Sequence, residues 1–116
     1  MQNTNFEKVL EFNYNCGVIN SDKVIRKENV FDNSSEVNNC MDLIRSEMKE
    51  LEDAVSQKDS LETLDALIDI LYVVYGMVAR FGYDMDEAFK LVHENNMSKL
   101  CSLQEAIESV EFYKEN

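Results

Sequence analysis

Apolar side chains recur every three or four positions along most of the chain, a spacing that is typical of amphipathic α-helices. With its flanking polar residues, the pattern predicts a first helix over Asn5 to about Asn15, a second from within 32–35 to about Gln57, and a third from about Ser60 to Gly82. Beyond these it predicts a fourth helix to about Lys99 and a last one over 102–114, where Ser102-Leu-Gln-Glu105 reads as a capping box. The short turn Lys58-Asp59-Ser60 makes the second and third helices antiparallel neighbours.

Composition agrees with an all-helical chain. There is no proline and there are only three glycines, of which Gly17 and Gly82 lie where helices are expected to end. A length of 116 residues suits one domain with a single core. The expected fold class is therefore all-α, a single domain built as a bundle of about four to five helices around a central antiparallel hairpin.

Acidic residues interrupt the most apolar of these helices. Asp69 stands within the apolar run 68–79, and Asp65 lies four residues upstream on the same side. The other directions of this third helix are apolar nearly all round, which predicts burial on most sides. One polar stripe remains, formed by Glu62, Asp65, Asp69, Tyr72 and Gly76. A carboxylate in such a helix is strongly destabilising unless a cation or an ionic partner compensates it.

The second helix carries a matching pair of acids. At about 100° per residue, Glu47 and Glu50 lie beside the apolar core arc of that helix. In an antiparallel hairpin this pair can face Asp65 and Asp69, and the converging charges need neutralisation. Mg²⁺ is the natural ion, with Mn²⁺ as the alternative, because both prefer carboxylate oxygens. Structural ion pairs remain open, and the available basic residues are Arg26, Arg45, Lys90 and Lys99.

The overall charge limits the classes of partner. A formal charge of −12 and a pI near 4.3 oppose binding to nucleic acid or to an anionic membrane surface. No apolar stretch approaches the roughly 20 residues that span a bilayer. The cysteines are Cys16, Cys40 and Cys101, and they are odd in number and widely spaced. Without an apolar leader after Met1, they indicate free thiols in a cytoplasmic compartment.

Four ordered blocks of the sequence resemble a known enzyme superfamily. The blocks are Leu43-Ile-Arg-Ser-Glu-Met-Lys-Glu-Leu-Glu-Asp-Ala54, Asp65-Ala-Leu-Ile-Asp-Ile-Leu-Tyr-Val-Val-Tyr-Gly76, Phe81-Gly-Tyr-Asp84 and Val92-His-Glu-Asn-Asn-Met-Ser-Lys-Leu100. Over about residues 36 to 100 the chain resembles the all-α nucleoside triphosphate pyrophosphohydrolases, which include MazG proteins, dimeric dUTPases and phosphoribosyl-ATP pyrophosphohydrolases. It is most similar to the phosphoribosyl-ATP pyrophosphohydrolase-like group.

The resemblance implies a Mg²⁺-dependent enzyme that cuts a nucleoside triphosphate between its α and β phosphates, giving a nucleoside monophosphate and pyrophosphate. Glu47, Glu50 and Asp69 match acids of the family motifs and would be metal ligands. Asp65, displaced by one residue from a motif position, would be a further ligand or a proton acceptor. Two expected glutamates are replaced, by Ser46 and Ala66.

A second motif of the family, Asn-x-x-Lys, falls on Asn96 and Lys99. The resemblance makes the Asn96 amide a ligand of the base or sugar and the Lys99 ammonium a ligand of phosphate. It also implies a homodimer or homotetramer. The competing hypothesis is a catalytically silent helical module that binds a nucleotide or a protein and uses its acids in ion pairs alone.

Overall fold

The computed structural model describes residues 3–115, with side chains described over 3–100 and 103–111. It consists of α1 (Asn5–Asn15), a short 3-10 helix η1 (Val30–Asp32), α2 (Ser34–Ser56), α3 (Ser60–Phe81) and α4 (Met85–Glu115). No strand occurs over the described range, so the predicted all-α class is confirmed. The chain divides into two units, Met1–Met85 and Asp86–Asn116, which are described separately.

Polar caps begin the three helices of the first unit. Thr4 and Glu7 form a reciprocal capping box at α1, in which the Thr4 hydroxyl accepts from the Glu7 amide at 3.1 Å. The side chains of Asn33 and Asp59 accept amide hydrogen bonds of 3.1 and 3.0 Å at the starts of α2 and α3. Among the four positions 32–35 from which the second helix was expected to begin, Asn33 is therefore the cap.

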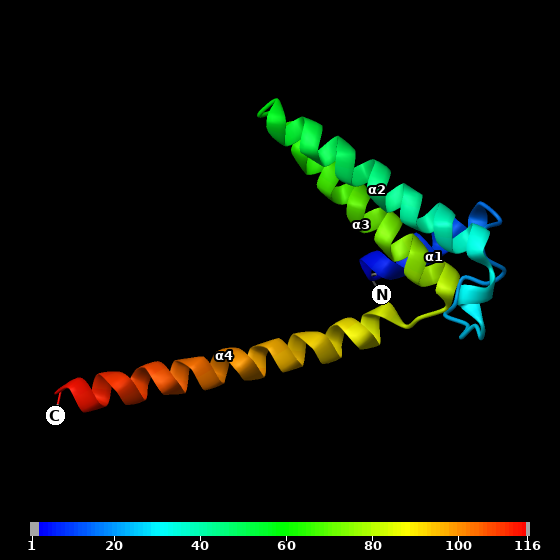
Figure 1. Ribbon diagram of the computed structural model, residues 1–116. Coiled ribbons are helices and arrows are strands. Elements are labelled where there is room, and N and C mark those ends of the chain that lie inside the picture. The colour runs from blue at the N-terminus through cyan, green and yellow to red at the C-terminus, as the bar shows by residue number, and fades with distance from the viewer. Residues whose placement is uncertain (1–2, 116) are drawn as a thin grey trace. The chain divides into compact units, whose positions relative to one another are not determined.

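The antiparallel hairpin is confirmed as the centre of the first unit. α2 and α3 run side by side along their length (Figure 1) and make the most extensive contact between elements. Small buried side chains on both helices, Ala54 on α2 and Ala66 on α3, allow the two backbones to approach closely. This close approach brings the polar edges of the two helices together.

α1 closes the core against the second half of α3. Phe6 and Leu10 of α1 pack with Ile19 and with Ala79 of α3 in one buried cluster. Asn13 is buried as well, and its side-chain amide donates to the Val9 carbonyl at 2.9 Å.

The loop between α1 and α2 crosses the end of α3. Gly82 ends α3 in the left-handed conformation, with φ of 75°. A Cβ at Gly82 would collide with the backbone oxygen of Ile25 and lie 2.9 Å from the amide nitrogen of Lys27. Glycine is therefore required twice here, for its φ angle and for its lack of a side chain.

Two expectations about the helices are wrong. The stretch predicted as two helices is the single helix α4, because no glycine or proline between Met85 and Glu115 interrupts the hydrogen-bonding ladder. α3 is also less buried than predicted, because α1 and α2 cover only part of it. Its exposed apolar side chains are Leu61, Leu64, Leu67, Ile68, Leu71 and Tyr72. Among the described residues, no helix is both long enough and apolar enough to cross a membrane.

Candidate metal centre

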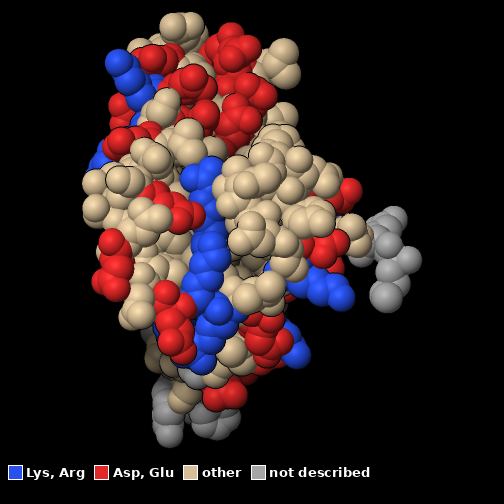
Figure 2. Space-filling model, turned by 90° about the vertical axis from the view of Figure 1, so that its right-hand side faces the viewer, with Lys and Arg blue, Asp and Glu red and all other residues tan. Residues whose placement is uncertain are grey.

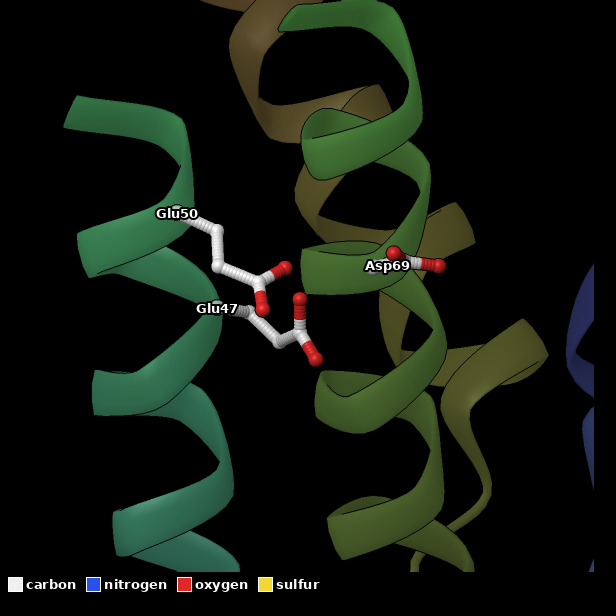
Figure 3. A group of neighbouring side chains, drawn as sticks. All are labelled: Glu47, Glu50 and Asp69. Carbon is white, nitrogen blue, oxygen red and sulfur yellow. The ribbon is translucent and has the colours of Figure 1, made fainter. Parts of the chain in front are cut away.

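Three carboxylates from two helices converge in the first unit. Glu47 and Glu50 project from α2 toward α3, where Asp69 lies (Figure 3). One ligand oxygen from each of the three residues can be chosen so that all lie within 4.8 Å of one another. Glu47 and Glu50 are three residues apart and so share one face of α2. The hairpin therefore gathers acids that are about twenty residues apart in sequence.

The group is partly shielded from water. Glu47 and Asp69 are half-buried, whereas Glu50 is exposed. The Oε2 atom of Glu47 is buried and has no hydrogen-bond partner. A buried carboxylate oxygen without a partner is destabilising, and a cation at this position would compensate it.

The electrostatics of Glu47 reflect this crowding. Burial is the largest cause that raises the pKa of Glu47 above 4.5, followed by repulsion from Glu50 and a hydrogen bond with the Glu50 side chain. The charges of Asp69 and Asp65 raise the same pKa further. Three neighbouring carboxylates of the two helices thus act on Glu47 through space.

Within the first unit, no basic side chain that the structure describes pairs with any of these four acids. Arg45, one of the proposed partners, binds Asp42 on its own helix at 3.1 Å. Arg80 points its Nη1 at the Cys40 sulfur, 3.5 Å away. On the face drawn in Figure 2, acidic side chains crowd the upper end, and a run of Lys and Arg side chains lies below them with further acids on both sides.

The donor set fits a hard divalent cation. Mg²⁺ and Mn²⁺ favour carboxylate oxygens and keep some ligand positions for water and phosphate. An octahedral Mg²⁺ with bonds of about 2.1 Å takes ligand oxygens up to about 4.2 Å apart. The three oxygens, which lie within 4.8 Å of one another, are close to that spacing. Three carboxylates leave room for further ligands.

Asp65 stands beside this group and outside it. It is exposed and lines a pocket of about 290 Å³ with Glu50, Asp53 and Glu62. Ala66, which occupies a position where the family motif has glutamate, also lines this pocket and is 3% exposed. Asp53 of α2 also lines this pocket, although no motif of the sequence had indicated it. The pocket extends the acidic surface from Glu50 toward the α2–α3 turn.

The remaining predicted site residues are on α4. Asn96 and Lys99 are exposed and three residues apart, so they share one face of that helix. They belong to the second unit, and their approach to the acids stays a prediction. Ser46, at the other altered motif position, is exposed on α2.

Comparison with known proteins identifies the family. The sequence profile of phosphoribosyl-ATP pyrophosphohydrolase matches residues 18–96, which include both acid pairs and Asn96. A similar protein, the uncharacterized protein L479 of Acanthamoeba polyphaga mimivirus, is 43% identical over 84 residues, which are 72% of this chain and 33% of that protein. The chain thus spans about a third of that relative's length. No solved structure is significantly similar. The chain belongs to the phosphoribosyl-ATP pyrophosphohydrolase family.

Proposed function

We propose that the chain is a Mg²⁺-dependent nucleoside triphosphate pyrophosphohydrolase that cleaves between the α and β phosphates, with Mn²⁺ as an alternative ion. The family supports a pyrophosphohydrolase-type hydrolase, and its members generally depend on a divalent metal. The observation that carries the proposal is the convergence of Glu47, Glu50 and Asp69, because none of the three has a basic partner among the described residues of the first unit.

Each acid has a role in this proposal. Glu47, Glu50 and Asp69 hold the ion, and the buried Oε2 of Glu47 gains the partner that it lacks. Bound Mg²⁺ would neutralise phosphate charge and lower the pKa of a bound water. Asp65, one helical turn from Asp69, is a further ligand or accepts the proton of the attacking water. Its exposure leaves it open to solvent for that transfer.

Asn96 and Lys99 are the proposed substrate ligands. Their shared face on α4 offers an amide to the base or sugar and an ammonium to the phosphates. A positive side chain suits this role because the acids of the first unit would otherwise repel a nucleotide. Lys99→Gln should therefore raise KM for the nucleotide. The thermal stabilisation by the metal ion should change little.

The test is pyrophosphate release from the common ribonucleoside and deoxyribonucleoside triphosphates with Mg²⁺. Glu50→Gln and Asp69→Asn should each lower turnover by at least about 100-fold without unfolding the protein. Glu52→Gln is the matched control, because Glu52 is an exposed acid of α2 outside the group. Normal turnover in Asp69→Asn would overturn the ligand assignment. Lack of turnover by the unaltered protein with every nucleotide would favour the silent binding module. The replacement of two motif glutamates by Ser46 and Ala66 would explain that outcome, because two acids of the family motifs are missing.

We also propose a homodimer or homotetramer. The exposed apolar side chains of α3, including Leu64, Leu67 and Leu71, support assembly because a second copy would cover them. Light scattering coupled to size-exclusion chromatography measures the mass of the particle. A monomer at micromolar concentration would contradict this proposal without affecting that of the metal site.

A further inference from the structure

An aromatic pair lies next to the acids, where α1 crosses α3. The rings of Phe12 and Tyr72 meet edge to face, with centroids 5.5 Å apart and an interplanar angle of 84°. Asn13 of α1 reaches the same side of α3, because its Nδ2 lies 3.8 Å from where a Cβ of Gly76 would be. The C-terminal half of α1 therefore lies against the stripe of α3 that carries the acids.

The pair is open to solvent in the first unit. Phe12 is 52% exposed and Tyr72 is 38% exposed. The buried side chains of α1 are Phe6, Val9, Leu10 and Asn13. At about 100° per residue, Phe12 lies about 60° outside the arc that those four define. Packing of the core does not require an aromatic ring at position 12.

The position of the pair relative to the acids is fixed by α3 itself. Tyr72 follows Asp69 by three residues, which places their Cβ atoms roughly 5–6 Å apart on one side of the helix. In the other direction from Asp69, the surface consists of Glu50, Glu62 and Asp65 around the acidic pocket. More carboxylates repel phosphates and offer no flat apolar surface. A nucleotide whose phosphates are held at Glu47, Glu50 and Asp69 would thus find a surface for its base on the Phe12–Tyr72 side.

We propose that Phe12 and Tyr72 form the platform that receives the nucleobase of the substrate. This inference rests on the proposed function, since phosphates at the acid group set where the base falls. Every base has a π-face, so stacking on an aromatic ring binds bases with little sequence preference. The platform thus supplies affinity for a nucleotide over a phosphate chain without a base, and the choice among bases is left to polar contacts.

The test compares ligands with and without a base. Binding of Mg²⁺ with inorganic triphosphate, and of Mg²⁺ with each of the common nucleoside triphosphates, is measured by calorimetry. Phe12→Leu and Tyr72→Leu should weaken nucleoside triphosphate binding by roughly 5- to 150-fold and leave inorganic triphosphate binding unchanged. Tyr72→Phe keeps the ring and should bind nucleotides as the unaltered protein does. Phe31→Leu is the matched control, because Phe31 is an exposed aromatic residue outside the acid group. Its ring pairs with that of Phe81, with centroids 5.7 Å apart.

The outcomes separate the two proposals. Nucleotide binding that is unchanged in both leucine variants would overturn the platform and leave the proposed function standing. Equal loss of inorganic triphosphate and nucleotide binding would also overturn it, because the rings would then support the fold or the metal site. A loss that follows a change in particle mass would assign the rings to contact with a second copy. If the unaltered protein bound neither ligand, the proposed function would fail and the platform with it. Thermal unfolding of each variant measures whether the fold is kept, and Tyr72→Phe is the mildest change in the set.

Discussion

Replacing Glu47 by glutamine should stabilise the metal-free protein while removing its response to Mg²⁺. The carboxylate of Glu47 is half-buried, and it lies among the like charges of Glu50 and Asp69 without a basic partner in the described part of the first unit. Glutamine keeps the length and shape of the side chain and removes the charge. A charged residue that serves only to bind a cation should destabilise the folded protein when the cation is absent.

The size of the effect follows from the spacing of the oxygens. Two unit charges 4.8 Å apart repel by about 0.9 kcal/mol in a water-like dielectric and by about 3.5 kcal/mol at an effective dielectric of 20. Solvent reaches Glu50, so the lower figure suits that pair, and two such repulsions amount to about 2 kcal/mol. For a chain of 116 residues, whose entropy of unfolding is about 2.1 cal/mol/K per residue, that is a rise in Tm of roughly 8 °C at neutral pH.

Differential scanning fluorimetry in EDTA and along a Mg²⁺ titration measures both parts. The unaltered protein should gain about 2.7 kcal/mol at a Mg²⁺ concentration of 100 times Kd, and Glu47→Gln should gain little. Glu52→Gln, an exposed acid of the same helix, should match the unaltered protein in both conditions. A lower Tm for Glu47→Gln in EDTA, or an undiminished response to Mg²⁺, would refute the reasoning that repulsion within this group is relieved by a cation.

Three further predictions concern pH and backbone geometry. Since the folded state raises the pKa of Glu47 above 4.5, the folded metal-free protein binds more protons than the unfolded chain. Its free energy of unfolding should therefore decrease as pH rises from about 4.5 through the raised pKa, and denaturant titrations in EDTA should show this slope reduced in Glu47→Gln. Gly82→Ala should lower the free energy of unfolding by about 2 kcal/mol or more, because of the positive φ and the collision of the new Cβ with the preceding loop. Gly76→Ala should raise the free energy of unfolding by up to about 1 kcal/mol, because its Cβ would make an ordinary contact. Urea titration measures both changes and distinguishes their signs. Asn33→Ala should lower the free energy of unfolding by about 1 kcal/mol in the same titration, because the backbone amide of Glu36 in α2 loses its hydrogen-bond acceptor.

The convergence of the acids could be predicted because it depends on two regular quantities. The helical period fixes which side of α2 carries Glu47 and which side of α3 carries Asp69. The short turn before Ser60 then forces the two helices to run antiparallel as neighbours. The continuity of α4 could also have been predicted, because no glycine or proline lies between Met85 and Glu115, but the pattern from Ser102 to Glu105 fits the start of a new helix as well. A serine followed by a glutamate three residues later has the same spacing inside a helix as at its start, and only a helix breaker would distinguish the two.

The position of the fourth carboxylate could not be predicted from the period alone. Ala66 is 3% exposed, so position 66 belongs to the packed side of α3, where Ala54 of α2 is also buried. Asp65, one residue earlier and about 100° around the helix, is exposed and lines the acidic pocket instead. A carboxylate at position 66 would start from a buried position beside Glu50, which lines the same pocket, and would add a further negative charge there. Moving the charge to position 65 keeps an acid within range of Glu47, whose pKa it still raises, while its own carboxylate stays hydrated. In the proposed site, three carboxylates would hold the ion, and the fourth, Asp65, lies at the rim with its side chain open to solvent water.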